Sequence, residues 1–131
     1  MNDDRQAAGL TNYLVAYALL ELTRLKEIAD DSIAHQLRKV IQYADEGQVF
    51  LEDTNRRPQA AKCANQKGEA AYLLAQEPGE DWLIRMSQAI TAQAEAIRLL
   101  AKSREVEKTT LEQRFAMFRQ ALEGTLSRQA L

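Results

Sequence analysis

The amino-acid sequence predicts an all-α protein, an up-and-down antiparallel bundle of four to five helices. Helix-forming residues dominate the 131 positions, with 21 Ala and 17 Leu against five Gly and two Pro. No stretch alternates apolar and polar residues for long enough to indicate a β-strand. Long helices joined by short loops favour an antiparallel bundle. The length and the 46% hydrophobic content fit a single helical domain, residues 1–131.

The first predicted helix covers residues 4–29. Between Tyr13 and Leu20 the sequence is apolar on nearly every side of a helix. A helix of this kind is buried on most of its sides. We therefore expect the first helix to lie at the centre of the bundle.

The second predicted helix runs from about residue 32 to residue 53. Asp30, Asp31 and Ser32 precede it, and all three are good N-cap residues. Gly47 interrupts the pattern, and glycine inside a helix costs about 1 kcal/mol relative to alanine. It therefore indicates either a kink or the true end of this helix.

The third predicted helix begins near Pro58 and ends before Pro78, and one of its faces carries only small residues. That stripe consists of Ala61, Ala64, Gly68, Ala71 and Ala75. A face without bulk allows another helix closer than the usual 8–10 Å between helix axes. The nearby Lys62 and Lys67 argue against a membrane helix. We expect tight packing at this stripe to compensate for the helix propensity that Gly68 loses.

The last third of the chain holds one or two helices. Glu80 and Asp81 mark the start of the fourth helix, because acids are favourable at a helix N-terminus. Thr109 and Thr110 have the spacing of a capping box, which predicts that a fifth helix starts there. No Gly or Pro forces a break between the two, so one continuous helix is the alternative.

The residues that common catalysis requires are scarce. A single Cys63 excludes an internal disulfide framework and a zinc site built on paired cysteines. The single His35 has no Glu three residues before it, which excludes the paired Glu-x-x-His pattern of di-iron bundles. The chain also lacks a glycine-rich phosphate loop. We expect no catalytic residue, no metal and no cofactor, and hence a non-enzymatic protein.

Charge and hydropathy bear on location. The net charge of −2 excludes a strongly basic nucleic-acid coat. The longest apolar run has eight residues, Tyr13 to Leu20, whereas a membrane span needs about 20. The chain starts with acidic residues rather than the positive segment of an export signal, and it has one thiol. We expect a cytoplasmic protein without membrane contact.

Apolar residues of the C-terminal part suggest a partner surface, formed by Trp82, Phe115, Phe118 and Leu122. If the helices cannot all bury their apolar faces, the remaining face needs another chain. We therefore favour a small protein-interaction module, such as a regulator, an adaptor or a subunit of a larger assembly. A homodimer through the last helix is one form of this hypothesis.

A basic run suggests a second function. Arg56, Arg57, Lys62 and Lys67 occur without any acid between Thr54 and Gly68. At a helix start, basic side chains and free backbone N–H groups can hold an anion. A nucleic-acid backbone and an acidic protein surface are both candidates for it.

The segment around His35 suggests a third function. Residues 33–39 resemble the histidine phosphotransfer family, whose members are four-helix bundles of about this size. In that family a lysine follows the phosphorylated histidine three residues later, and a glycine follows the lysine. Here Arg38 and Lys39 hold those positions. The resemblance implies phosphotransfer at His35.

Overall fold

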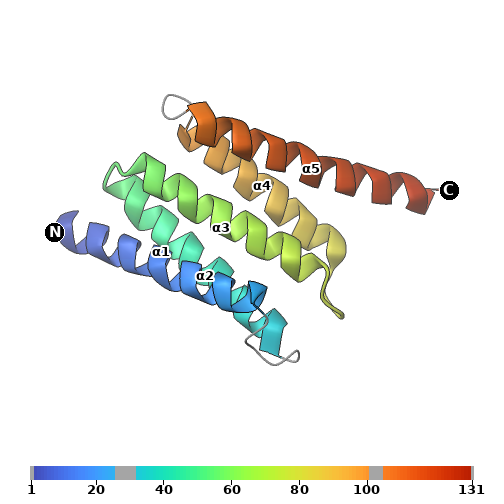
Figure 1. The fold of residues 1–131 in the computed structure, drawn as a ribbon, viewed down its shortest axis with the longest axis horizontal. Helices are drawn as coiled ribbons and strands as arrows, with labels where there is room; N and C mark the ends of the chain where they lie inside the picture. Colours follow the sequence, from blue (N-terminus) through green and yellow to red (C-terminus); the bar gives the residue numbers. More distant parts are fainter. Residues whose placement is uncertain (1, 26–31, 101–104, 131) are drawn as a thin grey trace.

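The computed structural model describes residues 2–25, 32–100 and 105–130. These residues form five α-helices and no strand (Figure 1). The helices are α1 (Asn2–Arg24), α2 (Ile33–Asp53), α3 (Arg57–Ala75), α4 (Trp82–Leu100) and α5 (Glu105–Ala130). Successive helices run in opposite directions. The predicted all-α, up-and-down antiparallel bundle is confirmed.

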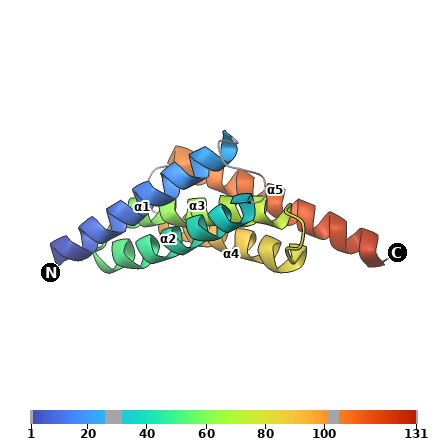
Figure 2. The same ribbon diagram turned by 90° about the horizontal axis from the view of Figure 1, so that it is seen from below.

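The central helix is α3, not α1. Most contact between helices joins elements that follow one another in the chain, and α1 also touches α3. Figure 1 places α1 and α5 at opposite edges, and Figure 2 shows α2 and α4 on one side of α3. Buried residues of α3 belong to all three clusters of the hydrophobic core. The expected central position of the first helix was therefore wrong.

Small residues explain why α3 holds this position. All five members of the predicted stripe, Ala61 through Ala75, are buried. A Cβ atom added to Gly68 would lie 2.6 Å from Gln93 Nε2 and 3.2 Å from the carbonyl oxygen of Ala89, both on α4. Real Cβ atoms essentially never approach a heavy atom as closely as 2.6 Å. The expected tight packing at the stripe is confirmed, and α4 is the helix that packs against it.

A second close approach joins α1 and α2. A Cβ atom on Gly9 would lie 2.8 Å from Leu51 Cγ, and one on Gly47 would lie 3.2 Å from the Gly9 carbonyl oxygen. Helix α2 continues through Gly47 to Asp53, and the glycine allows the close contact with α1. The glycine therefore does not mark the end of the helix.

Three helix ends differ from expectation. Helix α1 ends at Arg24, and residues 26–29 of the predicted first helix lie outside the described part. So do Asp30 and Asp31, two of the residues expected to cap the second helix. Ser32 lies at the N-cap of α2, but its side chain makes no capping hydrogen bond. Helix α5 begins at Glu105, so Thr109 and Thr110 lie inside it rather than at its start.

The start of α4 agrees better with the sequence. The Asp81 carboxylate accepts a 3.0 Å hydrogen bond from the backbone N–H of Ile84, as an acidic N-cap does. Helices α4 and α5 are two separate helices that pack against each other. The alternative of one continuous helix is therefore excluded.

We predict opposite effects for two glycine-to-alanine changes. Gly68→Ala places its methyl group against Gln93 and Ala89, and we expect a loss of about 1–3 kcal/mol in the free energy of unfolding from overpacking. Gly68→Leu should cost more. Gly124→Ala is the control, because nothing lies within 4 Å of the added methyl on α5. It should stabilise by about 0.5–1 kcal/mol through helix propensity. Thermal unfolding measures both, and an unchanged midpoint for Gly68→Ala would contradict the packing described here.

Candidate functional site

The predicted basic cluster divides into two parts. Arg56, Arg57 and Lys62 are exposed at the beginning of α3. The Lys67 side chain is only 17% exposed, and its ammonium lies 2.9 Å from Asp45 Oδ1 and 3.6 Å from Glu95 Oε2. The structure therefore brings three of the four residues to one exposed end of α3 and uses the fourth to join helices.

The predicted aromatic surface lies largely in the core. Phe118 is 1% exposed, and its ring stacks on Tyr72 of α3 at 4.7 Å between ring centroids. Trp82 and Leu122 are partly buried and pack against the same cluster. Phe115 is partly buried and lines a pocket on α5. Trp82, Phe118 and Leu122 therefore join α4 and α5 to a core cluster that α3 shares.

His35 is exposed in the first turn of α2. Lys39 is also exposed, whereas Arg38 forms an ion pair with Glu80, in the turn that precedes α4. Arg38 thus contributes to the contact between α2 and the start of α4.

Cys63 is a packing residue. It is 0% exposed, and a Cβ atom on Gly47 would lie 3.2 Å from its Sγ. Burial raises the pKa of the Cys63 thiol to about 12, although the positive charge of Lys67 acts in the opposite direction. Because the thiolate is the nucleophilic form, this thiol is unreactive at neutral pH in the folded protein.

The described residues offer neither a metal-ion site nor a membrane-spanning helix. They contain no group of three His, Cys, Asp or Glu side chains that could hold a metal ion. No described helix combines the length and the apolar character that crossing a membrane requires.

Two charged residues on opposite sides of α3 connect all five helices. Lys67 lies between Asp45 of α2 and Glu95 of α4. Glu69, two residues later, forms ion pairs with Arg24 of α1 and with Arg114 of α5. Residues two apart point to opposite sides of a helix. The sequence shows these charges but not their partners, which come from four other helices.

Buried amides form a second polar set that sequence reasoning missed. Gln48, Gln66 and Gln93 are at most 5% exposed. Their amide nitrogens donate to Glu95, to the Tyr13 carbonyl and to Asn65 respectively. Their Oε1 atoms have no hydrogen-bond partner among the described residues. Twelve glutamines occur in the sequence, and no local pattern singles out these three.

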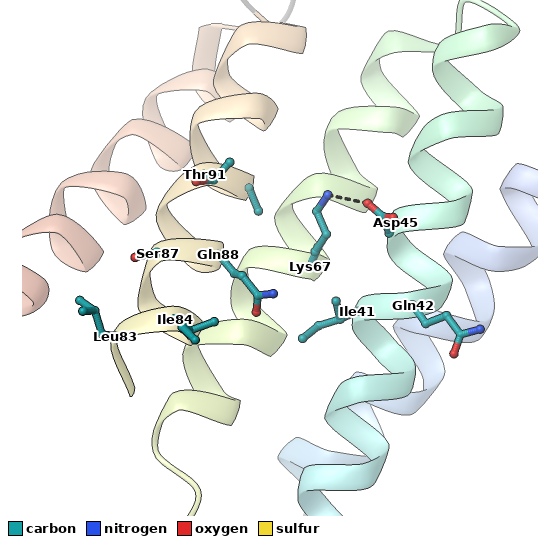
Figure 3. A pocket seen from close by; sticks show the side chains of 10 residues that line it. Ile41, Gln42, Asp45, Lys67, Leu83, Ile84, Ser87, Gln88 and Thr91 are labelled. Carbon is teal, nitrogen blue, oxygen red and sulfur yellow. Dashed lines mark hydrogen bonds and ion pairs between the residues drawn. The ribbon is translucent and has the colours of Figure 1, made fainter. Parts of the chain in front are cut away.

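A groove of about 690 Å³ lies between α2 and α4, with Lys67 of α3 at its floor (Figure 3). Apolar side chains gather at one end, where Leu83 is 47% exposed and Ile84 is 56% exposed. The Arg38–Glu80 ion pair joins α2 to the start of α4 beyond that end. Beyond the other end, Gln48 donates a 2.7 Å hydrogen bond to Glu95. Polar links from α2 to α4 therefore bound the groove at both ends.

Helix α1 leaves an apolar face uncovered. Four large side chains are well exposed, three on α1 and the fourth that of Leu25, which directly follows it. The exposed fractions are 61% for Leu14, 52% for Tyr17, 41% for Leu22 and 66% for Leu25. We call this the outer face of α1. Helix α1 itself lies at one edge of the molecule (Figures 1 and 2).

Comparisons with protein-family models, with curated proteins and with solved structures find no match for this chain.

We predict that Lys67 matters more for stability than Lys62 on the same helix. Lys67→Ala leaves the carboxylates of Asp45 and Glu95 without their shared cation, and we expect a loss of about 1–2 kcal/mol. Lys62→Ala changes an exposed side chain and should stay within about 0.5 kcal/mol of the parent. Lys67→Met separates charge from packing, because it keeps most of the stem. Urea unfolding followed by Trp82 fluorescence measures all three, and equal stability for Lys67→Ala and Lys62→Ala would contradict the prediction.

Proposed function

We propose that this protein is a small non-enzymatic interaction module, a regulator, adaptor or subunit of a larger assembly, that binds a protein partner through the outer face of α1. The single observation that supports this is the exposure of Leu14, Tyr17, Leu22 and Leu25 on one edge helix and the residue that directly follows it. Monomeric proteins rarely expose large contiguous apolar patches, and such patches mark interaction sites.

The energies involved make this face a better candidate than the aromatic residues of α5. Full burial of a Leu side chain gains about 1.5–3 kcal/mol relative to exposure. Leu14 and Leu25 each have more than half of that gain still available to a partner. Phe118 has none, because the core already buries it. We therefore propose the first helix, rather than the last, as the surface that binds the partner.

The distribution of apolar residues in α1 supports the same choice. The segment from Tyr13 to Leu20 is apolar on nearly every side. The fold covers one side of α1 with α2, where Ala16 and Leu20 are buried. The opposite side carries the exposed residues. A helix that is apolar all round is normally buried, so we infer that another chain covers the second side of α1.

One alternative keeps a specific observation in its favour. Arg56, Arg57 and Lys62 are exposed together, and none of them forms an ion pair within the described part of the chain. They support binding of a phosphate backbone, without Lys67. We further propose a cytoplasmic location, which the lone thiol favours.

A photo-crosslinking amino acid at position 17 tests the proposal in the native host. We expect Tyr17 replacement to yield an adduct with a protein, because the partner covers this position. The same crosslinker at Lys39, an exposed position on α2, is the matched control and should yield none. No adduct from position 17, or equal adducts from both positions, would contradict the proposal. An adduct that nuclease digests would favour the nucleic-acid alternative.

A further inference from the structure

We propose that the outer face of α1 binds the same face of a second copy of this chain, with the two α1 helices antiparallel. This inference rests on the proposed function, since it names the partner of that surface. The two-fold symmetric contact would use one face of each copy, as in most homodimers.

The spacing of the exposed residues fits a helix partner. The central line of the outer face consists of Ala7, Thr11, Leu14, Ala18, Glu21 and Leu25, and all six are exposed or partly exposed. Their spacing is four, three, four, three and four residues, which is the a and d pattern of a coiled-coil seam. The line is therefore built to lie along another helix rather than to hold a compact ligand.

The line is complementary to itself when it is reversed. We place the two-fold axis at the height of residue 16 along α1. Each residue of the outer face then lies opposite the residue of the second copy whose number, added to its own, gives 32. Leu14 then meets Ala18 of the second copy, and Leu25 meets Ala7. Each large side chain faces a small one, which is how helix faces interdigitate. The remaining pair places the Thr11 hydroxyl opposite the Glu21 carboxylate, so the polar residues also face each other.

The helix dipoles favour the antiparallel direction. In the antiparallel arrangement the dipoles of the two α1 helices are opposed, which is favourable, whereas a parallel pair would align them.

The size of the face sets the expected strength. A helix of 23 residues is about 34 Å long and, with side chains, about 10 Å wide. The footprint is therefore roughly 350 Å² per copy, about half of the roughly 800 Å² per partner that is typical of stable complexes. We expect a dimer that dissociates on dilution, with a dissociation constant on the order of 100 μM.

Cysteine crosslinking of the full chain tests the register. The double variant Thr11→Cys/Glu21→Cys brings each new thiol opposite one of the second copy, and mild oxidation should convert it to a covalent dimer. The two single variants are the matched controls, because positions 11 and 11, or 21 and 21, lie about 15 Å apart along an antiparallel pair. That separation is too long for a disulfide. The buried Cys63 does not compete for oxidation.

Sedimentation velocity of the unmodified protein from 10 μM to 1 mM is the companion measurement. We expect the mass to rise from 14.8 kDa towards twice that value, and Leu14→Glu to abolish the rise without lowering the melting temperature. A monomer at 1 mM, or dimers that Leu14→Glu leaves intact, would overturn the inference. Efficient crosslinking of the single variants would overturn the antiparallel register. If position 17 captures a different protein in the host while the pure chain stays monomeric, the proposed function holds and only the self-pairing fails.

Discussion

The close approach of α3 to its neighbours is the constraint on which the rest of the structure depends. A line of alanines with Gly68 at its middle removes side-chain bulk from α3, so that α4 approaches until only the absence of a Cβ prevents a clash. Gly9 and Gly47 do the same between α1 and α2. Dispersion contacts grow with such proximity, and they compensate for the helix propensity that interior glycines lose. This packing makes α3 the helix that every cluster of the core shares.

Polar contacts then order the other helices around α3. Lys67 is shared by acids of α2 and α4, and Glu69 is shared by arginines of α1 and α5. Partly buried pairs of this kind contribute less to net stability than apolar burial does, but a helix placed in another register leaves a charge unpaired. The buried amide of Gln93, which donates to Asn65 beside Gly68, adds the same constraint at the closest contact. Small residues thus bring the helices together, and polar residues select one arrangement.

The sequence predicts the helix content and the tight stripe well, because both depend on local spacing. It predicts the position of α1 poorly. A helical segment that is apolar on all its sides favours burial. Its sequence does not show whether this chain or another one covers it. The partners of Lys67 and Glu69 could not be predicted for a similar reason. They lie 22 or more positions away, on helices whose rotation the sequence does not give. Phe118 was assigned to a surface because an aromatic spacing looks the same at an interface and in a core.

The stable centre of the protein is therefore α3, and the binding surface that we propose lies on α1, which is packed on one side only. Hydrogen exchange followed by mass spectrometry at about 10 μM, below the expected dimer concentration, tests this division most directly. Amides of α3 should exchange slowest, and those along α1 should exchange much faster, because local opening of an edge helix breaks fewer contacts. Protection of α1 equal to that of α3 in the dilute monomer would contradict the account.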